Sequence, residues 1–367
     1  MSTERVTSST SAAAGRFAGL DGLRALMVLL VVLDHQHVIA FGWVGVEALF
    51  VLSGFLITGL LWKAREQMLR PYLVRFYGRR VLRISPLYYA FLLLCAVLSA
   101  GGHLGGGVRP ALPWLASYTY NFWLASRWFT PSFSIGHLWS ISVEEQFYLI
   151  WPLVVFACSR RSLRRVLIGV VLLGPVIRLA EVWLLTRPWF PANPDTAQAM
   201  YVLAPTHFDA LAAGGFMALF PLGGARKLLF GLLVSTAFAV VLALAVSPTL
   251  RDHGGYGPGG VLIWGFSLLN VTAAVCIDCL TARKLCPWLF DWRPLRYLGT
   301  ISYGLYVFHV PVQWAVNRRF DGASVWLRLG LELALTVVVA AASFHGFERP
   351  FLTLKQRFFP EASAPAA

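Results

Sequence analysis

The chain alternates between long apolar stretches and shorter segments that carry most of its charge. Each apolar stretch has about 20 residues, the length that an α-helix needs to cross the hydrocarbon core of a bilayer. Ten stretches of this kind predict ten membrane-spanning helices, at 22–41, 43–62, 81–100, 139–157, 165–185, 200–220, 226–246, 259–281, 297–316 and 325–345. The pattern therefore predicts an all-α, polytopic membrane bundle.

Composition supports this class of protein. Of the 367 residues, 57% are hydrophobic and 13% are charged, with a mean hydropathy of +0.65. The longest segment between predicted helices, 101–138, is rich in Gly, Pro and aromatic residues, and we expect a structured loop at the membrane surface. The polar residues 1–16 lead directly into a full-length apolar stretch, so no cleavable signal peptide is expected.

The basic residues predict an orientation. Counting through Arg24, both termini and one alternating set of loops hold 23 Lys and Arg residues, whereas the opposite loops hold six. The positive-inside rule therefore predicts cytoplasmic termini, in agreement with an even number of helices, in a plasma or inner membrane. This asymmetry also accounts for the net charge of +14, so no nucleic-acid partner is expected.

Charged residues within apolar stretches are costly and mark candidate sites. Arg24 and His35, both in the first stretch, are eleven residues apart. This separation is about three helical turns, so both side chains share one face, roughly 16 Å apart along the axis. Arg24 is near the cytoplasmic end and His35 is in the outer half. The alternative interpretation is a snorkelling arginine and an interfacial histidine.

The third stretch begins with several arginines, in "FYGRRVLRISPLYY". Arg80 and Arg83 are three residues apart and therefore share a helix face. Two guanidinium groups on one face suit a phosphate, which they can bind through forked hydrogen bonds. Anchoring of the helix at the cytoplasmic surface is the alternative.

Carboxylates and a second histidine complete the candidate set. Glu47 lies near the outer end of the second stretch, Asp209 near the middle of the sixth, and His309 in the outer half of the ninth. In the fourth stretch, Ser142 and Glu145 fit a capping box, which leaves Glu144 as the better functional candidate.

Sorted by expected depth, the candidates form two groups. The cytoplasmic group contains Arg24, Arg80 and Arg83, and the outer group contains His35, Glu47, Glu144 and His309. A basic inner mouth below acid–base groups predicts a phosphate-bearing donor that enters from the cytosol. Arg178 and Glu181 are spaced for a local ion pair on the fifth helix. No metal-ligand cluster is evident, so no metal is expected.

Six segments together resemble acyltransferase family 3, the integral membrane O-acyltransferases. They are "LDGLRALMVLLVVLDH", "GWVGVEALFVLSGFLIT", "RRVLRISPLYY", "HLWSISVEEQFYLIWP", "ISYGLYVFHVPV" and "FERPF", in the order of the family and across residues 20–352. The resemblance implies a bundle of about ten helices that transfers an acyl group, often acetyl, from cytosolic acyl-CoA to a hydroxyl. Family acceptors are mostly glycans of the cell envelope; some members acylate macrolides or other secreted metabolites.

The resemblance also assigns residues. The Arg-x10-His motif of the family falls on Arg24 and His35, and its Arg-x-x-Arg motif falls on Arg80 and Arg83. The histidine is implied to be the catalytic base, and the arginines are implied to hold the CoA phosphates. Arg24 and Glu144 complete the catalytic set, while Glu47, Asp209 and His309 are candidates for orienting the base or binding the acceptor. The chain departs from the family pattern at Asp34 and His207.

These expectations divide the chain into a cytoplasmic tail (1–18), a transmembrane acyltransferase domain (19–352) and a second tail (353–367), without an appended hydrolase-like domain. Acyl-CoA is expected as a substrate rather than as a permanently bound cofactor. A proton-coupled transporter is the first alternative, although no inverted repeat is evident. A non-catalytic membrane scaffold is the second, and it does not require an arginine–histidine face.

Overall fold

The computed structural model is all-helical wherever it describes the chain, with no strand in those residues. The described residues are 18–39, 41–102, 107–126, 135–187, 196–224, 227–228, 230–236, 261–283 and 286–360. The all-α class predicted from the apolar pattern is therefore confirmed.

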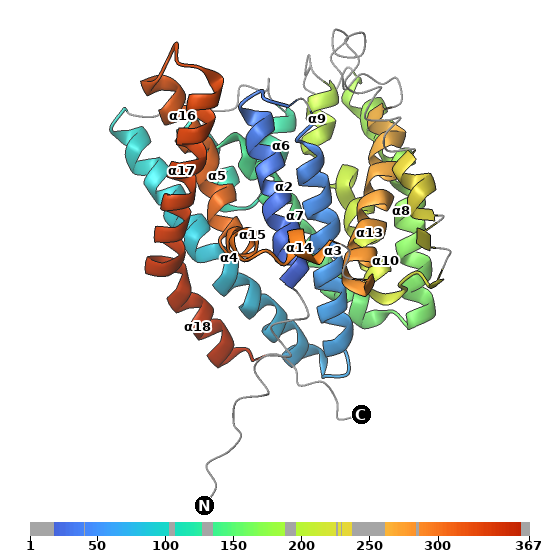
Figure 1. Cartoon of the computed structure of the whole chain (residues 1–367). Helices are drawn as coiled ribbons and strands as arrows, with labels where there is room; N and C mark the ends of the chain where they lie inside the picture. Colours follow the sequence, from blue (N-terminus) through green and yellow to red (C-terminus); the bar gives the residue numbers. More distant parts are fainter. Residues whose placement is uncertain are drawn as a thin grey trace, which may run out of the picture.

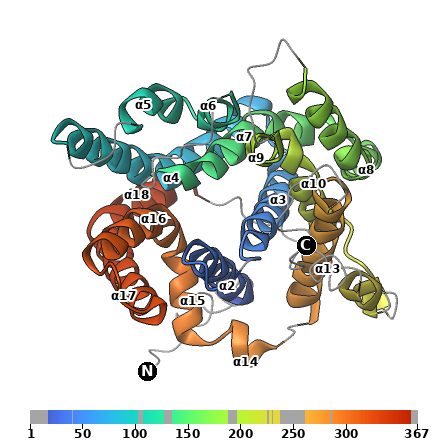
Figure 2. The same ribbon diagram turned by 90° about the horizontal axis from the view of Figure 1, so that it is seen from above.

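The longer helices run roughly along one direction and form a bundle (Figure 1). Seen end-on, α2 and α3 lie toward its middle and the other helices surround them (Figure 2). The long helices are α2 (Ala18–His35), α3 (Val44–Ala64), α4 (Leu69–Ala100), α7 (Trp139–Ala157), α8 (Arg160–Leu185), α10 (Phe208–Leu219), α13 (Phe266–Arg283), α16 (Ser302–Arg319) and α17 (Val325–Ser343). The shorter ones are α5 (Val108–Ala116), α6 (Tyr120–Ser126), α9 (Thr196–Val202), α14 (Pro287–Phe290), α15 (Arg293–Thr300) and α18 (Arg349–Phe358).

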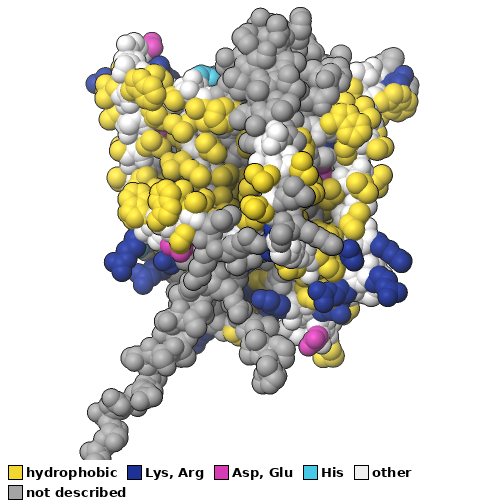
Figure 3. All heavy atoms as spheres, turned by 45° about the vertical axis from the view of Figure 1, so that its right-hand side comes forward, with side chains coloured by type: hydrophobic (Ala, Val, Ile, Leu, Met, Phe, Trp, Pro, Cys, Tyr) yellow, Lys and Arg dark blue, Asp and Glu magenta, His cyan; other side chains and the backbone are white. Residues whose placement is uncertain are grey.

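Five helical segments of the described chain are long and apolar enough to cross a membrane. They are Val44–Ala64, Leu69–Ala100, Arg160–Leu185, Ile263–Thr281 and Val325–Phe358, which overlap five of the ten predicted spans. The second begins before its predicted span at 81–100, and the last extends beyond its predicted span at 325–345. On the face seen in Figure 3, hydrophobic side chains occupy much of the middle, and Lys and Arg side chains gather mainly toward the lower end. We call this the basic end; α3 finishes there and α4 begins there.

Several predicted spans differ from the observed helices. The sixth, predicted as one helix over 200–220, is broken into α9, a 3-10 turn (Pro205–His207) and α10, because Pro205 has no N–H to continue the first helix. The ninth is divided at Ile301 into α15 and α16. The seventh, 226–246, lies largely outside the described residues.

The first span also ends earlier than predicted, at His35 instead of residue 41. The chain reverses there through His37, whose φ of 58° is left-handed. Asp34 supports the reversal, because its Oδ1 accepts a hydrogen bond from the Gly42 N–H at 3.0 Å. The unusual Asp34 therefore contacts the backbone of the turn between α2 and α3.

The predicted capping box at the fourth helix is wrong. The helix α7 begins at Trp139, so Ser142 lies inside its first turn, fully buried, with no hydrogen-bond partner for its hydroxyl. The predicted loop at 101–138 is structured in its described part, since it contains α5, α6 and a 3-10 turn at Gly136–Leu138.

Two glycines hold α3 closely against α10. A Cβ on Gly54 would collide with the carbonyl oxygen of Leu211, and one on Gly214 would collide with that of Val51. Small residues at such positions let helix backbones approach directly. The contact fixes α3, which carries one wall of the candidate site.

Candidate functional site

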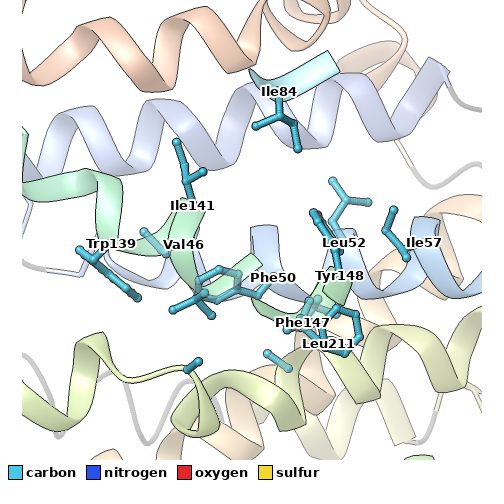
Figure 4. Close-up of a cluster of buried hydrophobic side chains, with 14 of the residues drawn as sticks. Val46, Phe50, Leu52, Ile57, Ile84, Trp139, Ile141, Phe147, Tyr148 and Leu211 are labelled. Carbon is cyan, nitrogen blue, oxygen red and sulfur yellow. The ribbon is translucent and has the colours of Figure 1, made fainter. Parts of the chain in front are cut away.

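A cavity of about 180 Å³ lies between α2, α3, α4, α7 and α16. Its wall combines apolar side chains with three arginines, one carboxylate and several hydroxyls. Figure 4 shows part of the apolar wall, which includes Val46, Phe50, Leu52, Ile57, Ile84 and Ile141. The polar members are Arg24, Ser53, Arg80, Arg83, Ser140, Glu144, Tyr148, Ser302, Tyr303 and Tyr306.

The cavity brings together the three arginines that the sequence assigned to one group. Arg24 pairs with Asp21 on its own helix at 2.7 Å. Arg80 and Arg83 form no ion pair with a carboxylate anywhere in the described chain, and Arg83 is exposed. Two guanidinium groups that share a cavity without carboxylate partners make the cavity suited to an anionic ligand.

Glu144 lies in this same cavity and not with the outer group, where the expected depth had placed it. Its Oε2 accepts a hydrogen bond from the Tyr148 hydroxyl at 3.0 Å, and that hydroxyl also contacts Ser53 Oγ. The Arg80 guanidinium lies 4.9 Å from the centre of the Tyr148 ring. Arg80 and Glu144 are therefore coupled through one tyrosine.

His35 and His309 form a direct pair beyond the cavity. Their rings stack with centroids 5.0 Å apart, and His35 Nδ1 lies 3.0 Å from His309 Nε2. His309 Nδ1 lies 2.6 Å from the Tyr306 carbonyl oxygen, which can only accept, so this nitrogen must carry the proton. His309 Nε2 is then an acceptor, and His35 Nδ1 must donate to it. The arrangement leaves the lone pair of His35 on Nε2.

Tyr306 links the histidine pair to the cavity. Its ring lines the cavity, its carbonyl holds His309, and its hydroxyl lies 2.5 Å from Ser140 Oγ and donates to the His137 carbonyl at 2.9 Å. His137 in turn packs edge-on against His309, with ring centroids 4.9 Å apart. The cavity thus ends at a hydrogen-bonded Tyr306–Ser140 contact, next to the histidines.

Glu47 does not contact His35. Its Oε1 lies 2.7 Å from His207 Nδ1, and both side chains are fully buried. His207 Nε2 lies 2.6 Å from the Tyr201 carbonyl oxygen, to which it donates. Glu47, a predicted orienting residue, therefore contacts His207, one of the two departures from the family pattern, between α3 and the break before α10. A role for Glu47 in orienting the base stays a prediction.

Asp209 lies in a separate buried network. It contacts Arg178 at 2.5 Å, Ser267 at 2.6 Å and Asn270 at 3.0 Å. The predicted local pair of Arg178 with Glu181 is wrong, because Glu181 instead accepts from the Thr206 hydroxyl at 2.5 Å. This network holds α8, α10 and α13 together; acceptor binding by Asp209 stays a prediction.

A family model described as "Acyltransferase domain" (the acyltransferase 3 type) matches residues 17–345. The chain belongs to acyltransferase family 3.

This acyltransferase family member resembles several curated bacterial proteins. It is 29% identical to the YrhL protein of Bacillus subtilis (strain 168), over 93% of the chain and 56% of that protein. It is 27% identical to the peptidoglycan O-acetyltransferase OatA of Listeria monocytogenes, over 90% and 55%, and 28% identical to the O-acetyltransferase OatA of Staphylococcus aureus, over 90% and 56%. The chain thus spans about half the length of these relatives. No solved structure gives a significant match.

Four side chains of the candidate site are outside the set predicted from the sequence: Ser53, His137, Tyr148 and Tyr306. Ser53 and Tyr306 carry no charge, and their contacts come from other helices. Tyr148 alone had a local signal, because it follows Glu144 by four residues and such pairs share a helix face.

Proposed function

We propose that this protein transfers an acetyl group from cytosolic acyl-CoA to a hydroxyl of a cell-wall glycan. The family membership and the names of the relatives support O-acetylation of peptidoglycan. The observation that carries the proposal of an acyl-CoA donor is the cavity with two arginines that have no carboxylate partner.

In this proposal Arg24, Arg80 and Arg83 bind the CoA phosphates. Glu144 and Tyr148 restrain Arg80, while the apolar wall accepts the pantetheine arm. Val28 lines the cavity on α2, and His35 follows it by seven residues, or about 10 Å along the helix. The arm therefore runs from the arginines toward the histidine pair.

His35 is the catalytic base in this scheme. Its Nε2 takes the proton of an acceptor hydroxyl while the oxygen attacks the thioester carbonyl carbon. The tetrahedral intermediate collapses, the carbon–sulfur bond breaks, and the CoA thiolate takes the proton back from His35. His309 orients the ring, because its Nε2 accepts from His35 Nδ1 in both protonation states. General base catalysis of this kind contributes about 10²–10⁴-fold.

We also propose ten membrane spans with the basic end in the cytoplasm. The Lys and Arg side chains at the basic end support this orientation. The sequence supports it as well, because one set of loops holds 23 Lys and Arg residues and the opposite set holds six. The same proposal places residues 1–18 and 353–367 in cytoplasmic tails around a transmembrane domain at 19–352.

Cysteine labelling tests the orientation. Glu66 lies between α3 and α4, and Asp321 lies between α16 and α17 at the other end; both are exposed. In a variant without the five native cysteines, Asp321→Cys should react with an impermeant thiol reagent in right-side-out vesicles, whereas Glu66→Cys should react only after permeabilisation. The reverse pattern would contradict the proposed orientation.

Lysine substitutions test the donor site. Arg83→Lys keeps the charge but loses the forked hydrogen bonds to phosphate, which are worth about 1.5–3 kcal/mol. We expect acyl-CoA affinity, measured by calorimetry in detergent, to fall by about 10-fold or more. Arg75→Lys, which changes an arginine of α4 outside the cavity, is the matched control.

A CoA analogue without the 3′-phosphate identifies the group that is bound. If that phosphate is the partner of Arg83, the analogue should bind wild type and Arg83→Lys with similar affinity. Unchanged acyl-CoA affinity in both Arg80→Lys and Arg83→Lys would reduce these arginines to membrane anchors.

A further inference from the structure

The interface between α16 and α17 is polar on the side that faces the end of α2. On α16, His309, Gln313 and Asn317 follow each other at intervals of four residues and therefore lie along one face. On α17, Arg328, Glu332 and Thr336 repeat the same spacing. Ionisable and amide side chains inside a membrane bundle are rare without a function.

Contacts with α2 bring these two faces together beside the base. Gln36 directly follows His35, and its Nε2 donates to Glu332 Oε2 at 2.6 Å and to Asn317 Oδ1 at 3.4 Å. Figure 2 shows α2 next to α16, with α17 on the outer side of the bundle. We call the set Gln36, Gln313, Asn317, Arg328, Glu332 and Thr336 the polar seam.

Several groups of the polar seam have no partner in the described chain. Gln313 is 8% exposed and lies on the same face. Arg328 Nε, Glu332 Oε1 and Thr336 Oγ1 are buried without a hydrogen-bond partner, and no described cation forms an ion pair with Glu332. Buried polar atoms are almost always satisfied in proteins, so these groups point to a ligand that supplies the missing partners.

The donor does not account for the polar seam. None of its six residues lines the arginine cavity. Its α16 members extend from His309 away from Tyr306 and the cavity, toward Arg319 at the end of the helix. A ligand in the polar seam would therefore reach His35 from the side opposite to the arginines.

We propose that the polar seam is the subsite that binds acceptor hydroxyls next to the one that is acylated. The inference rests on the proposed function, since it assigns the acceptor of the same reaction. A sugar hydroxyl both donates and accepts hydrogen bonds. It can therefore donate to Glu332 Oε1 or an amide oxygen and accept from Arg328, Gln313 or Asn317. Neighbouring hydroxyls of one sugar ring match such an alternation of donors and acceptors.

Steady-state kinetics with acetyl-CoA and a peptidoglycan disaccharide test the assignment. The variants Asn317→Ala, Gln313→Leu and Glu332→Gln each remove a donor or acceptor from the polar seam. We expect the KM for the disaccharide to rise by about 10-fold or more, while the KM for acetyl-CoA stays within twofold. Leu335→Ala is the control, because Leu335 lies on α17 but is 46% exposed on the outer surface.

The outcomes separate this inference from the proposed function. If wild type releases no CoA from acetyl-CoA with the disaccharide, the proposed function fails and the subsite fails with it. If wild type transfers acetyl and the three variants keep the wild-type acceptor KM, only the polar seam assignment is overturned. A fall in kcat with unchanged KM values also overturns it, since the polar seam would then position His35 through Gln36 without binding the acceptor.

Discussion

His35→Gln should reduce acetyl transfer by about 10²–10⁴-fold while leaving acyl-CoA affinity within twofold of wild type. Glutamine keeps polarity and approximate size, but it cannot take up the proton of the acceptor hydroxyl. The donor site is unaffected because His35 lies about 16 Å along α2 from Arg24 and does not line the cavity. Transfer is measured in membranes with protein levels matched, and affinity is measured by calorimetry.

His309→Phe is the companion variant. Phenylalanine preserves the ring that stacks on His35 but removes the acceptor for His35 Nδ1. Because the base is then free to adopt the other tautomer, we expect a smaller fall, about tenfold, confined to kcat. If His35→Gln retains transfer within a factor of a few, His35 is structural and the base has to be sought at Glu144 or His309.

Asp209→Ala should destabilise the protein by about 3–5 kcal/mol, because it leaves the fully buried Arg178 guanidinium without a carboxylate. The thermal unfolding temperature in detergent should fall sharply and the folded yield should drop. The Arg178→Leu/Asp209→Leu double variant should recover most of that stability, since well-packed apolar side chains often replace a buried ion pair without loss.

A different result would reassign Asp209. If Asp209→Ala unfolds at the wild-type temperature and only its acceptor KM rises, Asp209 binds substrate, as the sequence first indicated. Equal destabilisation in the single and double variants would show that Ser267 and Asn270, and not Arg178, depend on the carboxylate.

The sequence predicted helices well where length and apolarity decide the outcome. Five of the predicted spans overlap helices able to cross a membrane, since a run of about 20 apolar residues has few alternatives. The prediction from sequence failed where helices end or are interrupted. The helix α2 ends at His35, where Asp34 contacts the Gly42 backbone across the turn, and the ninth span is divided at Ile301; neither feature changes the apolar pattern.

Site residues were likewise predictable within one helix but not between helices. Helical spacing placed Arg80 and Arg83 on one face, and the structure puts both in one cavity with Arg24. Partners from distant helices were not predictable, because spacing along one helix carries no information about its neighbours. Glu47 with His207, and Arg178 with Asp209, are pairs of that kind.

The helices that carry the proposed chemistry are not the ones best suited to lipid. The five segments apolar enough to cross a membrane do not include α2, α7 or α16, which carry Arg24, Glu144 and His309. Charged and polar side chains oppose insertion of a helix on its own, so we expect these helices to rely on apolar neighbours. An apolar frame would then enter the bilayer first and retain the polar helices. Replacing Arg24, Glu144 and His309 with leucine should therefore ease insertion and, under the proposed function, remove activity at the same time.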